Sequence, residues 1–411
     1  MNVSRESRPA AATTKVPSLR QRLTELRGPG VRPRSLDARA LAALAANPGC
    51  RRRALLDGAG VDKGALAHAL GSPAPYGQSQ FALARGNSFE ARVKADGGAE
   101  LLRLLCERLA PGTAVPEDDA VARPDLSAAG PEGRAARTAL ALRETAAAGG
   151  WALLDHPLLA MDVAGSPAYV EPDAVVVHPD GTWTVVEIKS FPLIDGAADA
   201  AKVGAAARQA AVYVLALEAV AEHAAAHTGR PVRVRDRMLL VCPKDFSNLP
   251  TAAPVDVRKQ LATTRRQLAR LTRVEEIAAT LPAGTTFDLR LADDGRTATR
   301  PAPELTEAVE AVPAAYAPEC LAACELAFHC RGRARQEGAV ETLGRSVRGE
   351  LGGLRTIEEA LAAAAGTPDT DAGALDDPAV QALRTAAALR AEALSGAAPV
   401  PAPRDGKGKD A

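Results

Sequence analysis

The chain has 411 residues, of which 47% are hydrophobic, enough to bury the core of one large domain or two ordinary ones. Only 3% are aromatic, whereas alanine is abundant, and this composition favours a helix-rich fold with small-residue packing. Lys and Arg total 50, as do Asp and Glu, so the formal charge is zero. This balance excludes a global positive field for nucleic acid, and any such surface must be a local patch.

The sequence favours a cytoplasmic protein with no membrane partner. No apolar run approaches the roughly 20 residues that cross a bilayer. The first residues are polar and rich in Arg, Ser and Pro, without the hydrophobic stretch of a signal peptide. In a reducing compartment, clustered cysteines are metal ligands or redox groups more often than disulfides.

The two ends of the chain have compositions that cannot bury a core. Residues 1–36 are predicted to form a disordered arm, and residues 366–411 a largely disordered tail rich in Ala and Pro, with a short helix over 377–394. Between them we expect a single domain over 37–365.

Hydrophobic periodicity within this domain predicts helices, then strands, then helices again. The expected helices are 37–46, 88–109, 133–148, 198–227, 256–279 and 355–365. The expected strands are 167–178, 182–190 and 233–242, and an acidic, Pro-containing segment over 110–132 is predicted to be a long loop. Because a long helix and a further strand follow two adjacent strands, we expect an α/β fold.

The first two strands are joined by His178-Pro179-Asp180-Gly181, a turn sequence that predicts a β-hairpin. Its first strand carries Asp173, and its second carries Glu187 and Lys189. Alternation along a strand places Glu187 and Lys189 on one face, and antiparallel pairing can bring Asp173 to the same edge.

Two carboxylates and a lysine at one edge are suited to phosphodiester hydrolysis. Carboxylates hold Mg²⁺ or Mn²⁺, the ion polarises the phosphate and activates water, and the lysine orients that water. The alternative is a solvent-facing hairpin with an ordinary ion pair, because an Asp and a Glu-x-Lys at this spacing also occur by chance.

Two further segments, one before and one after the hairpin, carry candidate site residues. Gln209 and Tyr213 are four residues apart on one face of the 198–227 helix, and Glu90 follows Gly86 in a predicted helix start. The stretch from Glu171-Pro172-Asp173 through Glu187-Ile188-Lys189 to Gln209-x-x-x-Tyr213 resembles the nuclease domain of the RecB family within the PD-(D/E)XK superfamily. The resemblance implies a restriction-endonuclease-like fold, with a mixed central sheet flanked by helices.

The resemblance also implies roles for these residues. Asp173, Glu187 and Lys189 would be catalytic, and Gln209 and Tyr213 would contact DNA. The metal ligands would be Glu90, Asp173, Glu187 and the carbonyl of Ile188. Glu90 stands where these nucleases often carry the His of Gly-x-x-x-His, so its alternative role is to favour the start of its helix.

Six cysteines are present, and three of them form Cys320-x3-Cys324-x5-Cys330. Such spacing suggests a metal or iron–sulfur site, for which Cys50 is the better fourth ligand and His329 the local one. One cysteine before the nuclease core and three after it resemble the iron–sulfur subgroup of these nucleases, as in AddB-type and CRISPR-adaptation nucleases, although the first spacing there is two residues. That resemblance implies a 4Fe-4S cluster, and a structural Zn²⁺ is the alternative. Cys106 and Cys242 are expected to be buried core thiols.

Basic residues flank the cysteines at both places, among them Arg51, Arg52, Arg53, Arg331, Arg333 and Arg335. A shared cluster would gather these residues into a local patch for the phosphate backbone, with Arg51 and Arg331 as DNA contacts. The 256–273 segment is a second basic candidate. For both, the alternative is a solvated charged surface.

These features together predict a metal-dependent deoxyribonuclease with a structural iron–sulfur cluster, expected to be an exonuclease, acting in DNA repair, recombination or defence. DNA, as single strands or ends, is the expected partner. No phosphate-binding loop of a helicase is present, so any unwinding requires a separate helicase or defence-system subunit. The alternative is a catalytically silent DNA-binding or scaffold protein of the same fold, with zinc in place of the cluster.

Overall fold

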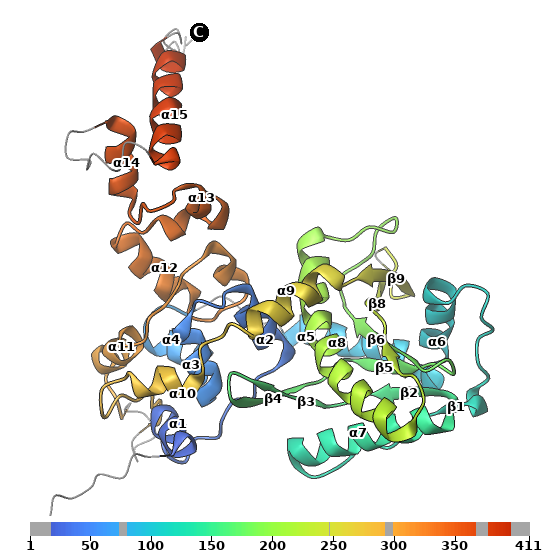
Figure 1. The fold of residues 1–411 in the computed structure, drawn as a ribbon. Coiled ribbons are helices and arrows are strands. Elements are labelled where there is room, and N and C mark those ends of the chain that lie inside the picture. The colour runs from blue at the N-terminus through green and yellow to red at the C-terminus, as the bar shows by residue number, and fades with distance from the viewer. Residues whose placement is uncertain (1–17, 74–79, 246, 292–298, 367–376, 396–411) are drawn as a thin grey trace, which may run out of the picture. The chain divides into compact units, whose positions relative to one another are not determined.

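The structure, a computed structural model, describes residues 18–73, 80–245, 247–291, 299–366 and 377–395 (Figure 1). The chain divides into two compact units. The first runs to Ala315 and also includes Ala323–Leu326, and the second comprises Tyr316–Ala322 and the chain from Ala327 onward. The division falls inside the span predicted as one domain.

A mixed sheet forms the centre of the first unit. Among the described residues it has seven strands: β1 (Val121–Ala122), β2 (Trp151–Asp155), β5 (Ala174–Val177), β6 (Thr182–Ile188), β7 (Arg233–Val234), β8 (Arg237–Pro243) and β9 (Pro250–Asp256). Their order is β1-β2-β5-β6-β8-β9, with β7 also paired to β6. The pairs β2–β5, β5–β6 and β8–β9 are antiparallel, and β1–β2, β6–β7 and β6–β8 are parallel. Two further strands, β3 (Leu159–Val163) and β4 (Ser166–Val170), form a separate hairpin.

Helices contact this sheet on its two faces, which confirms the predicted α/β class. Those of the first unit are α1 (Leu19–Arg27), α2 (Ala38–Ala46), α3 (Arg51–Ala59), α4 (Lys63–Ala69), α5 (Gln80–Val93), α6 (Ala95–Leu109), α7 (Gly130–Ala148), α8 (Ala200–Thr228), α9 (Arg258–Leu268), α10 (Val274–Ala279) and α11 (Ala302–Glu310). The second unit contains α12 (Ala327–Gln336), α13 (Arg345–Glu350), α14 (Ile357–Ala365) and α15 (Pro378–Ser395). Short 3-10 turns occur at Asp118–Ala120, Pro318–Ala322 and Val340–Leu343.

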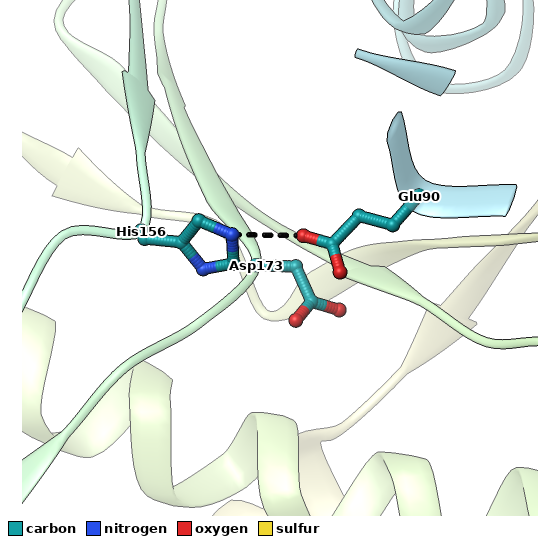
Figure 2. Close-up of side chains that lie close together, drawn as sticks. All are labelled: Glu90, His156 and Asp173. Atoms are coloured by element: carbon teal, nitrogen blue, oxygen red, sulfur yellow. Dashed lines mark ion pairs between the residues drawn. The ribbon is translucent and has the colours of Figure 1, made fainter. Parts of the chain in front are cut away.

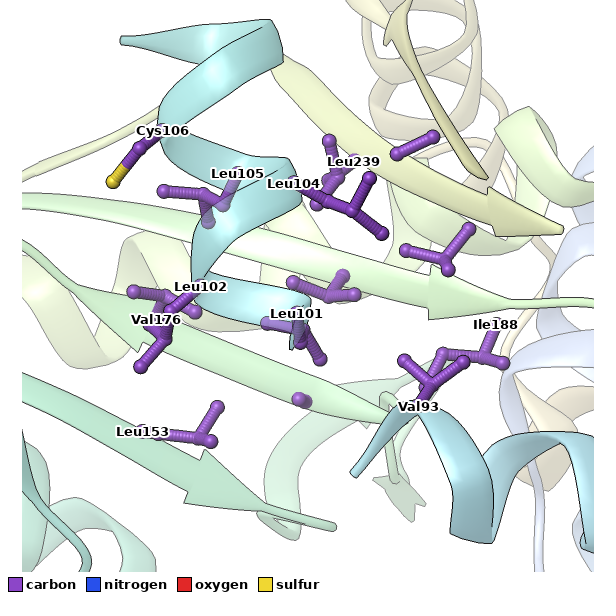
Figure 3. Packing of buried hydrophobic residues seen from close by; sticks show 14 of the residues in the cluster. Val93, Leu101, Leu102, Leu104, Leu105, Cys106, Leu153, Val176, Ile188 and Leu239 are labelled. Carbon is purple, nitrogen blue, oxygen red and sulfur yellow. The ribbon is translucent and has the colours of Figure 1, made fainter. Parts of the chain in front are cut away.

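The apolar side chains of α5 and α6 cover one face of the sheet (Figure 3). Leu101 and Leu105 of α6 are fully buried, and they share a core with Val186 and Ile188 of β6. Because side chains alternate along a strand, Glu187 points to the opposite face, where α7 and α8 contact the strands. Glu187 therefore shares its face of β6 with the fully buried side chains of Trp183 and Val185.

The predicted helix over 88–109 is broken, because Asp96, Gly97 and Gly98 have left-handed backbone angles. At Gly98 a Cβ would lie 2.5 Å from Leu153 Cδ2, so the close approach of helix to sheet requires glycine there. The break separates α5, which carries Glu90, from α6, which covers the sheet.

Other predicted bounds also need correction. The strand predicted over 167–178 is two strands, β4 and β5, because they pair with different partners. The helix predicted over 256–279 is two helices, α9 and α10. The predicted disordered arm contains α1, whose Leu26 is fully buried, whereas residues 1–17 lie outside the described ones. The helices predicted at 37–46, 133–148, 198–227, 355–365 and 377–394 are confirmed within a few residues.

The helix α8 is also, among the described residues, the only one long and apolar enough to cross a membrane by length and composition. Half of its most apolar window is buried in the fold, as in the central helix of a folded domain. The cytoplasmic location stays a prediction.

Candidate active site

The register of the β5–β6 hairpin places the predicted carboxylates side by side. Ala174 pairs with Val186, and continuing this antiparallel register by one residue sets Asp173 opposite Glu187. A hydrogen bond fixes the arrangement, because the amide of Ile188 donates to Asp173 Oδ2 at 2.6 Å. The turn depends on Gly181, with a φ of 78° and the Pro231 carbonyl 2.2 Å from where a Cβ would stand.

Glu187 is a fully buried carboxylate, with an exposed fraction of 0%. The ammonium of Lys189 forms an ion pair with Oε1. No donor among the described residues makes a hydrogen bond of normal geometry to either carboxylate oxygen. Burial raises the pKa of Glu187 to about 7, since the attraction of Lys189 offsets only part of the desolvation.

Asp173 and Lys189 complete this group of charges. Burial also raises the pKa of Asp173, against the opposing effects of Lys189 and the Ile188 amide. Desolvation disfavours the charged form of Lys189, but the carboxylates of Glu187 and Asp173 outweigh it and the pKa of Lys189 is raised. Lys189 is therefore a protonated hydrogen-bond donor at neutral pH.

Glu90 reaches the same edge from α5, where Lys94 lies one helical turn further on. The Lys94 ammonium lies 2.5 Å from Glu90 Oε1 and 2.6 Å from Asp155 Oδ1. The pKa of Glu90 is lowered to about 2, first by its hydrogen bond with His156, then by Lys94, and despite partial burial. Glu90 is consequently ionised at neutral pH, with its charge directed at the Asp173 side of the site.

His156, directly after β2, is a site residue that the sequence reasoning missed (Figure 2). Its Nε2 lies 2.9 Å from Glu90 Oε1, and this hydrogen bond raises the pKa of His156 despite partial burial. Glu90, His156 and Asp173 each offer a ligand atom, all within 4.8 Å of one another. In the part of the chain that the structure describes, this is the only such group of three potential metal ligands.

The predicted ligand set is thus only partly brought together in this compact group. Glu90 and Asp173 belong to it, whereas Glu187 is paired with Lys189 beside it. Ile188 joins the site through its amide, and its side chain packs in the core. A ligand role for its carbonyl stays a prediction.

Tyr213 of α8 lies on the face of the sheet that carries Glu187. It is buried, and burial followed by the charges of Glu187 and Asp173 raises its pKa well above the ordinary value. A neutral phenol therefore borders the buried carboxylates. Gln209, one turn earlier on α8, is half-buried. Contact of these two side chains with DNA stays a prediction.

The proposed patch of arginines needs correction. Arg52 and Arg53 are buried, with exposed fractions of 7% and 5%. Arg52 Nε donates to the Val312 carbonyl, and Arg53 pairs with Asp57. These two side chains stabilise α3 and are not available to a phosphate backbone, whereas Arg51 is exposed.

The remaining basic candidates differ in their surroundings. Arg331 in the second unit lies over the Phe328 ring, 4.6 Å from its centroid. On α9, Arg258 pairs with Asp256 and Arg265 with Glu218, so part of that basic face is neutralised by neighbouring carboxylates. DNA contacts by Arg51 and Arg331 stay predictions.

The cysteines predicted to hold a cluster are divided between the two units. Cys50 and Cys324 belong to the first, and Cys320 and Cys330 to the second. The second unit contains only two of the chain's cysteines. Among the described residues of the first unit, no group of three potential metal ligands within 4.8 Å includes a cysteine. The four-cysteine cluster stays a prediction, as does its zinc alternative. Cys106 and Cys242 are buried at 3% and 0% exposure, which confirms them as core thiols.

Comparisons of the chain with protein-family models, with curated proteins and with solved structures found no match.

Proposed function

We propose that this protein is a divalent-metal-dependent DNA nuclease with a restriction-endonuclease-like core. The observation that carries the proposal is the paired end of β5 and β6, where Asp173 stands opposite Glu187 and Lys189 forms an ion pair with it. Glu90 from α5 adds a third carboxylate. Two strand ends, a helix and a lysine supply the donors that metal-assisted phosphodiester hydrolysis requires.

The donor set fits a divalent cation. Glu90 and Asp173 offer hard oxygen ligands, and the Glu187 oxygens are buried without a normal hydrogen-bond donor among the described residues. Lys189 offsets only part of the cost of ionising this buried carboxylate, so a divalent cation nearby would favour its charged form. When bound, such an ion supplies a Lewis acid that polarises the phosphate and activates water.

Each residue of the site has a separate role in the proposed reaction. Asp173 and Glu90 would hold a divalent ion at this edge of the sheet. Lys189, protonated and tied to Glu187, donates hydrogen bonds to a phosphate oxygen or the attacking water and offsets the charge that develops in the transition state. Buried Tyr213 keeps a neutral hydroxyl beside them.

The experiment is cleavage of labelled single- and double-stranded DNA in Mg²⁺, Mn²⁺ or EDTA by wild type, Asp173→Asn and Lys189→Met. Asn can still accept from the Ile188 amide, and Met has a similar length to Lys, so both variants are expected to fold. The matched control is Asp119→Asn, an exposed carboxylate of the Asp118–Ala120 turn.

We expect metal-dependent cleavage that falls by a factor of about 10²–10⁴ in both site variants and is unchanged in the control. Linear and closed circular DNA, compared in the same assay, separate an exonuclease from an endonuclease. Cleavage at the wild-type rate by Asp173→Asn would refute the assignment of this site.

A further inference from the structure

We infer that His156 is a metal ligand, so that Glu90, His156 and Asp173 form a mixed nitrogen–oxygen site that prefers Mn²⁺ to Mg²⁺. Their ligand atoms lie within 4.8 Å of one another and come from three separate elements, α5, the end of β2 and the start of β5 (Figure 2). The inference rests on the proposed function for the role of the ion in cleavage, but not for its binding.

The spacing of the donors supports a shared ion. Nε2 of His156 lies 2.9 Å from Glu90 Oε1. Two adjacent ligands of an octahedral ion, each about 2.1 Å from it, are themselves about 3 Å apart. The imidazole and the carboxylate are therefore separated by the distance that one ion imposes on neighbouring ligands.

The same position already attracts a cation. The Lys94 ammonium lies 2.5 Å from Glu90 Oε1, 3.0 Å from His156 Nε2 and 2.6 Å from Asp155 Oδ1. Three ligand-type atoms thus converge on one positive group. A divalent ion held by Glu90 and His156 would replace the ammonium at these two atoms and leave Lys94 its contact with Asp155.

The backbone of His156 is held in place by the other members of the site. Its φ of 45° is a left-handed conformation that non-glycine residues rarely adopt. Its amide donates to the Asp173 carbonyl at 3.3 Å, and its carbonyl accepts from Arg134 Nη2 at 3.1 Å. The uncommon conformation thus fixes His156 beside the Asp173 strand end.

The second ring nitrogen is oriented for this role. Nδ1 of His156 lies 3.8 Å from Glu171 Oε1, and Arg134 holds that carboxylate at 2.9 Å. A metal-bound histidine commonly directs its other N–H toward a carboxylate, which fixes the tautomer and leaves the first nitrogen free for the ion.

Imidazole nitrogen sets the preference among metals. Mg²⁺ strongly favours oxygen ligands and keeps much of its water shell, whereas Mn²⁺ also accepts nitrogen ligands. The later transition metals bind such sites more tightly than Mn²⁺ does. A site with one histidine and two carboxylates therefore binds Mn²⁺ more tightly than Mg²⁺. His156 is the ligand that produces this preference for Mn²⁺ over Mg²⁺.

The test is Mn²⁺ binding to the full-length protein, measured as the decrease in the six-line EPR signal of free Mn²⁺. Pulsed EPR on the same samples detects a nitrogen atom directly coordinated to the bound ion. The key variant is His156→Asn, because Asn tolerates a left-handed backbone. Mg²⁺ affinity is measured by competition in the same samples. His223→Gln, an exposed histidine on α8, is the matched control.

We expect nitrogen modulation from bound Mn²⁺ in the wild type and in the control, and its loss in His156→Asn. Mn²⁺ affinity should fall at least about tenfold in that variant, while Mg²⁺ affinity changes less. Absence of nitrogen modulation in the wild type, or unchanged Mn²⁺ affinity in His156→Asn, would overturn the inference even if DNA is cleaved. Nitrogen-coordinated Mn²⁺ in a protein that cleaves no DNA would support the inference and count against the nuclease.

Discussion

Glu187 provides the sharpest test of the electrostatics of the site. Its folded pKa is about 7, whereas its ordinary value is 4.5. Between these two pH values the folded state keeps a proton that the unfolded state has released. Stability is therefore present at low pH and is lost as pH rises through this window. The shift corresponds to a loss of about 2–3 kcal/mol between pH 5 and pH 8.

The isosteric variant Glu187→Gln removes this titration. We expect the difference in unfolding free energy between variant and wild type, in EDTA, to become more favourable to the variant by about 2–3 kcal/mol on going from pH 5 to pH 8. This double difference cancels the packing changes of the substitution. The ion pair with Lys189 needs no separate allowance, because the attraction of that ammonium is already part of the folded pKa of about 7.

The measurement is urea unfolding followed by tryptophan fluorescence. Both tryptophans, Trp151 and Trp183, lie in strands of the sheet, so the signal reports the unit that contains the site. Glu222→Gln, an exposed site on α8, should give a double difference close to zero. A value near zero or of opposite sign for Glu187→Gln would refute the conclusion that burial outweighs the attraction of Lys189 for this carboxylate. Added Mn²⁺ should reverse the advantage of the variant, since the ion stabilises the wild-type carboxylate.

The same fluorescence assay tests two structural assignments. Gly181→Ala should destabilise the sheet unit by at least about 1–3 kcal/mol, because a left-handed φ and the nearby carbonyl leave no room for Cβ, whereas Gly150→Ala, with nothing within 4 Å, should be neutral. Equal effects of the two would contradict the turn. Arg53→Met should cost about 2–4 kcal/mol by removing a partner of buried Asp57, and exposed Arg51→Met should cost less than about 0.5 kcal/mol. A neutral Arg53→Met would restore that arginine as a candidate for phosphate binding.

The sequence allowed the hairpin part of the site to be predicted because its determinants are local. A four-residue turn sets the register, and strand alternation then places Glu187 and Lys189 on one face with Asp173 opposite. The long helices were predictable for the same reason, since their apolar periodicity is written in consecutive residues. The α5–α6 break was missed, although Gly97 and Gly98 signalled it.

His156 could not be predicted in the same way. It follows a short strand, β2, whose antiparallel pairing sets Asp155 opposite Ala174. Only this pairing between segments far apart in the sequence brings His156 next to Asp173. Arg52 and Arg53 were wrongly predicted to be exposed, because a run of three arginines is typical of a solvated surface. Their partners, the carbonyl of Val312 and the carboxylate of Asp57, are visible only in the folded structure.

The charges around the site support the proposed divalent ion. The connected network has five carboxylates and three permanent cations: Glu90, Asp155, Glu171, Asp173 and Glu187 against Lys94, Arg134 and Lys189. With His156 neutral, as a ligand must be, two negative charges remain when all five carboxylates are ionised. The proposed divalent cation would balance them. A protein that used this fold only as a scaffold would gain nothing from a buried Glu187 that is costly to ionise, because an apolar residue at that position of β6 would stabilise the sheet more.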